Sequence, residues 1–442
     1  MLTGCTIEAN QASIFAGGML IDADSGPAAP VLSGCTFTGN IVSSTAVDHA
    51  SGGGIYNANG GSPVLESCTF NGNQAHGSYS FTGGGAIYND RSSASISGCI
   101  FTGNTANEDG GAIYHLISGQ LMIDNTDFYY NEAENGGAIC NLSSDPVKVT
   151  GSDFIGNQAS EKGGGFYGAS NSAGSFFNFC LFESNSAQSG GGMFLSNSNI
   201  RIVNNKFINN TAIGGGGLSI KNQDEQVFIT GSIFKENLAT SGAALYIENA
   251  SPKIGNCTLV DNDLVDYFLA NGSVIFNVNA TPTINNSIIW GNDSPDFYND
   301  AASSLFITWS DVQSGYGTSS DNNLKVNPML DTDARLMNGS PVIDQGNNTL
   351  VISDKTDIDN DSDTFEPLPL DIFNGPRMID GSATFPNGTS VIDMGADEFE
   401  FNVVDPDIDQ DGDVDGKDLH LYSIDLSQMG MSIFVGAFGR VD

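Results

Sequence analysis

The sequence predicts an all-β fold, a right-handed parallel β-helix of about eleven coils, and three observations lead to it. An apolar residue stands three places before an Asn eleven times along the chain, with 25 to 33 residues between successive apolar positions. The apolar runs are short, nearly alternating and rich in Ile, Val, Phe and Tyr, which is typical of strands. Gly, Asn and Ser separate these runs, and the period is that of a stacked-repeat architecture.

The apolar position of each repeat is expected to face the interior and to stack on its equivalents in neighbouring coils. A unit of two or three short strands cannot pair its backbone internally, so it must hydrogen-bond to units about 4.8 Å away. The crossover rule makes such a winding right-handed. Eleven coils predict a rod about 50 Å long. The eleven positions are Ile7, Phe37, Phe70, Phe101, Phe128, Phe154, Phe182, Phe207, Phe234, Leu259 and Ile289.

The Asn and Gly residues of each repeat are expected at the corners of the coil. Asn, as in "CTFNGN" ending at Asn73, tolerates the left-handed backbone conformation and hydrogen-bonds locally. Paired glycines before the next strand, such as Gly136 and Gly137, supply a positive φ or let neighbouring coils approach closely. The turn chemistry recurs because the turns are stacked.

Six of the seven cysteines occupy one repeated position, two residues before the apolar residue. Other coils place Ser, Thr or Asn there, so we interpret it as a small inward position and not as a metal or disulfide ladder. In-register Cβ atoms would lie about 4.8 Å apart, beyond the ~3.8 Å of a disulfide. The six are Cys5, Cys35, Cys68, Cys99, Cys180 and Cys257, and only Cys140 stands elsewhere.

The charge is strongly negative: 14 Lys and Arg stand against 52 Asp and Glu, a formal net charge of -38. Such a chain repels phosphate backbones, which argues against a nucleic-acid partner and favours cations. Residues 1–330 hold 28 carboxylates and the last 112 residues hold the other 24, so cation binding is expected near the C-terminus.

Export is inferred from the sequence as a whole. No stretch reaches the ~18 apolar residues of a membrane helix, and no basic-then-apolar signal peptide opens the chain. We interpret Met1 as a start inside a coil, and infer an extracellular or bacterial cell-surface location.

The repeat "GGAIYHLISGQLMIDNTDFYYN", from Gly110 to Asn131, resembles those of polymorphic outer membrane proteins and related bacterial right-handed β-helix proteins. The resemblance covers residues 2–292 and implies an adhesin-like surface rod. Two later stretches, residues 327–348 and 375–400, resemble the closing segment called a choice-of-anchor domain, which implies a terminal cap. We therefore divide the chain into a rod (1–326), an acidic closing or cap segment (327–400) and a small C-terminal segment (401–442).

The closing segment contains "DIDNDSDTFEP", with acids at alternate positions: Asp357, Asp359, Asp361 and Asp363. Four carboxylates this close repel one another unless a hard cation lies among them, and oxygen ligands suit Ca²⁺. A glycine at a sharp turn and a distal bidentate acid are not evident. A calcium site and a solvated acidic loop therefore both remain open.

The C-terminal segment contains "DIDQDGDVDGKDL", which has the ligand spacing of a twelve-residue EF-hand calcium loop. Gly412 fills the turn position, and Asp413 would bind through its carbonyl. The loop followed by "LHLY" resembles one half of a type I dockerin, which implies a cohesin-like partner. The second half of the segment lacks a ligand row. The predicted ligands are Asp407, Asp409, Asp411, Asp413, Asp415 and Asp418.

No catalytic residue is assigned, and two classes of function remain. The preferred one is a non-catalytic extracellular rod, a display or adhesin-like module with a glycan or cell-surface partner. The alternative is a polysaccharide-binding or polysaccharide-degrading β-helix, lyase-like or glycosidase-like. Asp127 and Asp153 occupy the same place in successive coils, but a solvated face is the preferred interpretation. The four histidines, His115 among them, are expected at the surface.

Overall fold

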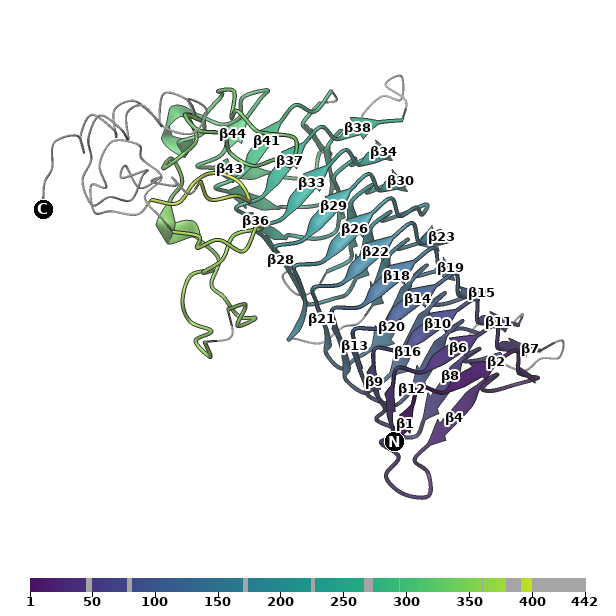
Figure 1. Cartoon of the computed structure of the whole chain (residues 1–442). Helices are drawn as coiled ribbons and strands as arrows, with labels where there is room; N and C mark the ends of the chain where they lie inside the picture. Colours follow the sequence, from purple (N-terminus) through teal and green to yellow (C-terminus); the bar gives the residue numbers. More distant parts are fainter. Residues whose placement is uncertain are drawn as a thin grey trace, which may run out of the picture.

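The computed structural model confirms the fold class: the chain winds into an all-β right-handed solenoid of about eleven turns with almost no helix (Figure 1). The structure describes residues 1–44, 50–77, 82–169, 174–223, 227–265, 273–293, 295–359, 361–378 and 391–399. Every strand pairs in parallel with its equivalents one coil away. Within these residues, no helix has the length and apolar character needed to cross a bilayer.

Four sheets, named A to D here, form the rod; A, B and D are continuous, whereas C is divided into two groups. Sheet A contains β1 (Leu2–Thr3), β5 (Val31–Ser33), β9 (Val64–Glu66), β13 (Ala94–Ser97), β17 (Leu121–Asp124), β21 (Val147–Thr150), β25 (Ser175–Asn178), β28 (Ile200–Val203), β32 (Phe228–Thr230), β36 (Lys253–Gly255), β40 (Thr283–Asn285) and β43 (Phe306–Thr308). Sheet B contains β2 (Thr6–Glu8), β6 (Thr36–Thr38), β10 (Thr69–Asn71), β14 (Ile100–Thr102), β18 (Asp127–Tyr129), β22 (Asp153–Ile155), β26 (Leu181–Glu183), β29 (Lys206–Ile208), β33 (Ile233–Lys235), β37 (Thr258–Val260), β41 (Ile288–Trp290) and β44 (Asp311–Val312).

The other two sheets complete each coil. Sheet C has one group of β3 (Gln11–Ala12), β7 (Ile41–Ser43), β11 (Gln74–His76), β15 (Thr105–Ala106), β19 (Glu132–Asn135) and β23 (Gln158–Lys162), and a second of β30 (Thr211–Gly214), β34 (Leu238–Ser241) and β38 (Asp263–Leu264). Sheet D contains β4 (Met19–Asp22), β8 (Ile55–Ala58), β12 (Ile87–Asp90), β16 (Ile113–Ile117), β20 (Ile139–Ser143), β24 (Phe166–Ala169), β27 (Met193–Ser196), β31 (Leu218–Lys221), β35 (Leu245–Glu248), β39 (Ile275–Val278) and β42 (Phe297–Asn299). Two short 3₁₀ helices follow the strands, η1 (Ser319–Asp321) and η2 (Asn348–Leu350).

The predicted apolar stack is confirmed. The rings of sheet B from Phe37 to Phe234 lie over one another with centroids 4.6 to 4.9 Å apart and planes within 2° to 9° of parallel. Each of these side chains is fully buried, and each such burial contributes about 1.5 to 3 kcal/mol. The stack is continuous because the register between coils is kept, as in the pairing of Phe128 with Phe154.

The Asn of every repeat after the first is buried, and the Asn residues form a hydrogen-bonded ladder that begins at the exposed Asn10. In the middle of the rod, Asn157 Nδ2 donates to Asn185 Oδ1 (3.0 Å) and to the Phe128 carbonyl (2.9 Å), and its Oδ1 accepts from Asn131 Nδ2 (2.9 Å). The left-handed residue at this corner is the preceding one, here Gly156 with a φ of 65°. The expectation that the Asn itself uses the left-handed conformation is therefore wrong. Asn suits this position because its side-chain amide both donates and accepts hydrogen bonds in the ladder.

Both alternatives for the paired glycines hold, one for each glycine of the pair. Gly136 has a φ of 63°, which side chains other than Gly rarely adopt. A Cβ on Gly137 would lie 2.4 Å from the Gly164 carbonyl oxygen and 2.6 Å from that of Gln158. The first glycine therefore turns the chain, and the second lets the coils pack.

The cysteine position faces the interior, and all seven thiols are free. Cys68, for example, is buried and its Sγ donates to the Leu32 carbonyl of the preceding coil at 3.4 Å. Burial raises the pKa of Cys180 and of Cys257 to about 12, so these thiols stay protonated. Cys140, outside the ladder, is buried between the rings of sheet D beside Tyr114.

The expectation of surface histidines is wrong for His115. Its side chain is fully buried at a position where neighbouring coils carry Asn89 and Asn141. His115 Nε2 lies 2.7 Å from the Gly119 carbonyl, and burial lowers its pKa to about 4. The imidazole takes an interior amide position and has no catalytic geometry there.

The closing segment, residues 327–378 and 391–399, packs along the flank of the last coils as well as past their end (Figure 1). It covers outward apolar side chains of sheets A and B, including Val203, Ile233 and Ile288. The fully buried Arg377 fixes it, because its guanidinium donates to the carbonyls of Gly395 (3.2 Å) and Ala396 (2.6 Å).

Candidate functional site

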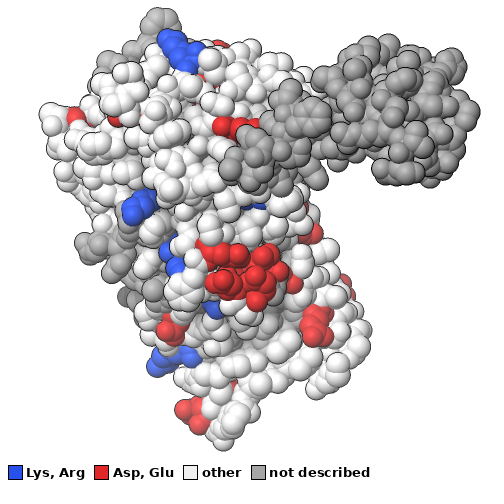
Figure 2. All heavy atoms as spheres, turned by 90° about the vertical axis from the view of Figure 1, so that its left-hand side faces the viewer, with Lys and Arg blue, Asp and Glu red and all other residues white. Residues whose placement is uncertain are grey.

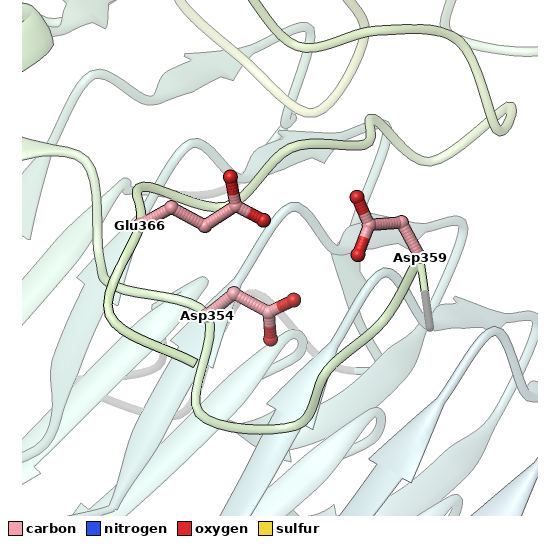
Figure 3. A group of neighbouring side chains, drawn as sticks. All are labelled: Asp354, Asp359 and Glu366. Atoms are coloured by element: carbon pink, nitrogen blue, oxygen red, sulfur yellow. The ribbon is translucent and has the colours of Figure 1, made fainter. Parts of the chain in front are cut away.

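A group of carboxylates stands out on the loop between Asp354 and Glu366. The carboxylate oxygens of Asp354, Asp359 and Glu366 lie within 4.8 Å of one another and point toward a common centre (Figure 3). A second group with the same mutual spacing contains Asp357, Asp359 and Asp361. Figure 2, which faces the side where the closing segment lies, shows a dense gathering of Asp and Glu. Asp359 belongs to both groups.

Backbone N–H groups of the loop donate hydrogen bonds to its carboxylates and fix its conformation. Asp354 is buried, and its two carboxylate oxygens accept from the backbone N–H groups of Thr356 (2.9 Å) and Ile358 (2.7 Å). Asp357 accepts from the N–H of Ser362 at 2.9 Å. Such Asp-to-backbone bonds fix the turns in which the carboxylates lie.

Glu366 carries the observation that distinguishes this loop from an ordinary acidic surface. Its Oε1 is buried and has no hydrogen-bond partner. Burial raises the pKa of Glu366, and the neighbouring Asp361 and Asp359 raise it further. A buried acceptor without a donor is costly, and a hard cation with oxygen ligands removes that cost. The donor set therefore fits Ca²⁺, with Asp354, Asp359 and Glu366 as the residues that would hold it.

The sequence predicted this loop but not all of the carboxylates that meet there. Of the four acids it named, Asp357, Asp359 and Asp361 come together, whereas Asp363 belongs to neither group and accepts from the Phe365 N–H at 2.8 Å. The acid that completes the first group is Glu366, three residues after Asp363. Its role was hidden because only the folding of the loop brings it back toward Asp354. The predicted ligands of the 407–418 loop lie outside the described residues.

A groove of about 410 Å³ lies on the outer face of sheet A. Residues 349–353 of the closing segment form one wall, and strands β32, β36, β40 and β43 form the floor. Phe228 and Phe306 supply aromatic surface, Lys253 supplies a charge, and Thr283 and Thr308 supply hydroxyl groups. This mixture of rings and polar groups is typical of a binding site for a polar ligand.

Chemistry that cleaves a glycan needs a base or a pair of carboxylates beside the substrate. The residues that line the groove include no Asp, Glu or His. Asp127 and Asp153 do face outward in register on sheet B, and burial followed by the charge of Asp127 raises the pKa of Asp153. They do not line the groove, so no carboxylate pair stands among its lining residues.

Comparison with known proteins agrees with the geometry of the rod. The family model described as "Right handed beta helix region" matches residues 17–207 and, in a second overlapping match, residues 136–326. A search of curated proteins found no match. The two matches span well over half of the 442 residues and coincide with the stacked coils. The chain belongs to the right-handed β-helix family.

Proposed function

We propose that the chain is an extracellular or cell-surface rod, an adhesin-like or display module, whose closing segment binds Ca²⁺. The observation that carries the proposal is the group of Asp354, Asp359 and Glu366, with one buried oxygen that lacks a donor. The stacked coils make a stiff spacer, because strands on several sides of each coil pair with those of both neighbours. The resemblance of the repeats to polymorphic outer membrane proteins supports a location at a bacterial surface.

A cation would stabilise the closing segment on the rod. The loop packs through Ile358 and Leu368 against Val203 of sheet A, so a metal that holds Asp354 to Glu366 also holds this contact. A ligand at 100 times its Kd stabilises the folded state by about 2.7 kcal/mol. We propose a second calcium ion on the loop from Asp407 to Asp418, and a cohesin-like or cell-surface partner for the 401–442 segment.

Titration calorimetry on the full chain tests the calcium proposal and separates its two sites. We expect two bound ions, one lost in the double variant Asp359→Asn, Glu366→Gln and the other lost in Asp407→Asn, Asp409→Asn. Asp363→Asn is the matched control, because it removes one acid of the same loop that lies in neither group. A binding heat that survives the first double variant unchanged would refute the site at Glu366.

The alternative function from the sequence, polysaccharide binding or degradation, gains support from the groove only for binding. Its lining has rings and hydroxyl groups but no acid or base. An assay for new reducing ends or unsaturated products, run on neutral and uronate polysaccharides with and without Ca²⁺, separates binding from cleavage. We expect no turnover; sustained product formation would favour the enzyme.

A further inference from the structure

One outward row of sheet A alternates cations with aromatic rings. The register places Lys148, Phe176, Arg201, Phe228 and Lys253 next to one another on five successive strands. Lys148 Nζ lies 5.7 Å from the centroid of the Phe176 ring, and the Arg201 guanidinium carbon lies 4.3 Å from that of Phe228. Lys253 Nζ lies 5.8 Å from Phe228 on its other side. The row is therefore a continuous strip of rings and positive charge.

The three cations of this row have no carboxylate within ion-pair distance among the described residues. The ion pairs of the described chain involve four other basic residues: Arg91, Lys162, Lys221 and Lys235. Burial is the larger effect on the pKa of Arg201 and lowers it. The charge of Asp354, which lies beyond ion-pair distance, raises it. In a chain with 14 basic and 52 acidic residues, three neighbouring outward cations that form no ion pair favour an anionic ligand.

The row continues into the groove beside the closing segment. After Lys253 the next two positions of the row are Thr283 and Phe306, and both line the groove together with Phe228 and Lys253. Phe306 is 58% exposed, which leaves its ring face free to stack on an apolar sugar face. Arg and Lys donors suit carboxylates, and the threonine hydroxyl groups suit those of a sugar.

The spacing of the row sets the charge pattern of the ligand. Cations recur on every second strand, and two strand spacings are about 9.6 Å. An extended pyranose unit advances by close to one strand spacing, so alternate sugars would meet a cation and the sugars between them a ring. A polysaccharide with a carboxylate on every sugar would have carboxylates without a cation beside them, and a protein of net charge -38 would repel these.

We propose that the row from Lys148 to Phe306 on the outer face of sheet A binds an acidic polysaccharide lengthwise, with a carboxylate on every second sugar. Lys148, Arg201 and Lys253 pair with the carboxylates, and Phe176 and Phe228 stack on the uncharged sugars between them. Phe306, two strands beyond Lys253, lies outside this alternation and stacks on the ring of a further sugar. The proposal develops the glycan-binding alternative and depends neither on Ca²⁺ nor on catalysis. It is tested by titration of the full chain, in calcium and in chelator, with hyaluronan, polygalacturonate and a neutral β-glucan.

We expect hyaluronan, which alternates charged and neutral sugars, to bind more tightly than the other two polymers in both conditions. Its affinity should fall as NaCl rises from about 50 to about 500 mM. The triple variant Lys148→Gln, Arg201→Gln, Lys253→Gln should weaken binding at least about tenfold. Phe306→Ala, at an exposed ring, should weaken it severalfold with the unfolding midpoint unchanged.

The matched control is the triple variant Lys162→Gln, Lys221→Gln, Lys235→Gln, which removes the same charge from three paired lysines on other sheets. An equal loss in this control would show a general charge effect and overturn the site. Tighter binding of polygalacturonate or of the neutral glucan would overturn the assigned charge pattern. Absence of binding to all three polymers would overturn the proposal, while the calcium stoichiometry, measured separately, would stand.

Discussion

The Asn ladder makes the sharpest prediction about stability, because Asn157→Asp changes hydrogen bonding without creating a cavity. Asn157 is fully buried, and its Nδ2 donates to Asn185 Oδ1 and to the Phe128 carbonyl. The substitution replaces this donor by an acceptor and loses two bonds worth about 1 kcal/mol each. The buried carboxylate would keep the donors of Asn131, but it would have no compensating cation, which costs several kcal/mol more. We expect a loss of about 4 to 6 kcal/mol at pH 7.

The pH dependence of this loss follows from the sign of the carboxyl pKa shift. Burial would raise the folded-state pKa of the new carboxyl above its unfolded value of about 3.9. Below about pH 4 the group is neutral in both states, and its hydroxyl can donate to Asn185 Oδ1, so the deficit shrinks to about 1 kcal/mol. The deficit then grows as the pH rises from about 4 through the raised pKa.

Urea unfolding followed by circular dichroism, with wild type and variant compared at each pH, measures this difference. The matched control is Asn249→Asp, because Asn249 donates to Asn222 Oδ1 at 2.9 Å in a second ladder that is exposed to water. We expect the control to cost less than about 0.5 kcal/mol. A loss below about 1 kcal/mol for Asn157→Asp at pH 7, or one that acid does not reduce, would refute the argument.

Three further predictions follow. His115→Asn restores the residue type of the neighbouring coils, and it should abolish the loss of stability that wild type shows as the pH falls from about 6.5 toward about 4, measured by thermal unfolding. Arg377→Lys removes the guanidinium fork that holds two carbonyls, and it should speed amide exchange at residues 391–399 while the coils stay protected. Cys180 and Cys257 should resist a thiol reagent at pH 8 until urea unfolds the rod, because burial keeps them protonated; rapid labelling of the native protein would contradict this.

The sequence predicted the coil stack because every coil packs the same kind of side chain at the same position. Phe128 and its equivalents recur at a fixed place before an Asn, and a repeated place in the sequence becomes a row in space. The role of the Asn was misjudged, since propensity for a left-handed corner and a ladder of amide bonds both select this residue. Only the φ of Gly156 and the contacts of Asn157 separate the two causes.

The candidate sites were less predictable because they join residues that no repeat relates. The acidic run pointed to Asp357 and Asp359, but Glu366 and Asp354 join them only through the path of the loop. The strip on sheet A was invisible for another reason. Lys148, Arg201 and Lys253 stand about 50 residues apart in alternate coils, and they form a row only once the register is known.

The equivalence of the coils also bears on how such a rod changes its length. Phe128, Phe154 and Phe182 each meet the next ring in nearly the same geometry, and the Asn three places later repeats the same bonds. If one whole repeat were deleted, the two flanking coils could therefore pack on each other with the same contacts. We therefore expect the fold to tolerate duplication or loss of complete repeats, in steps of one strand spacing, and to tolerate an insertion of a few residues only in the loops between strands.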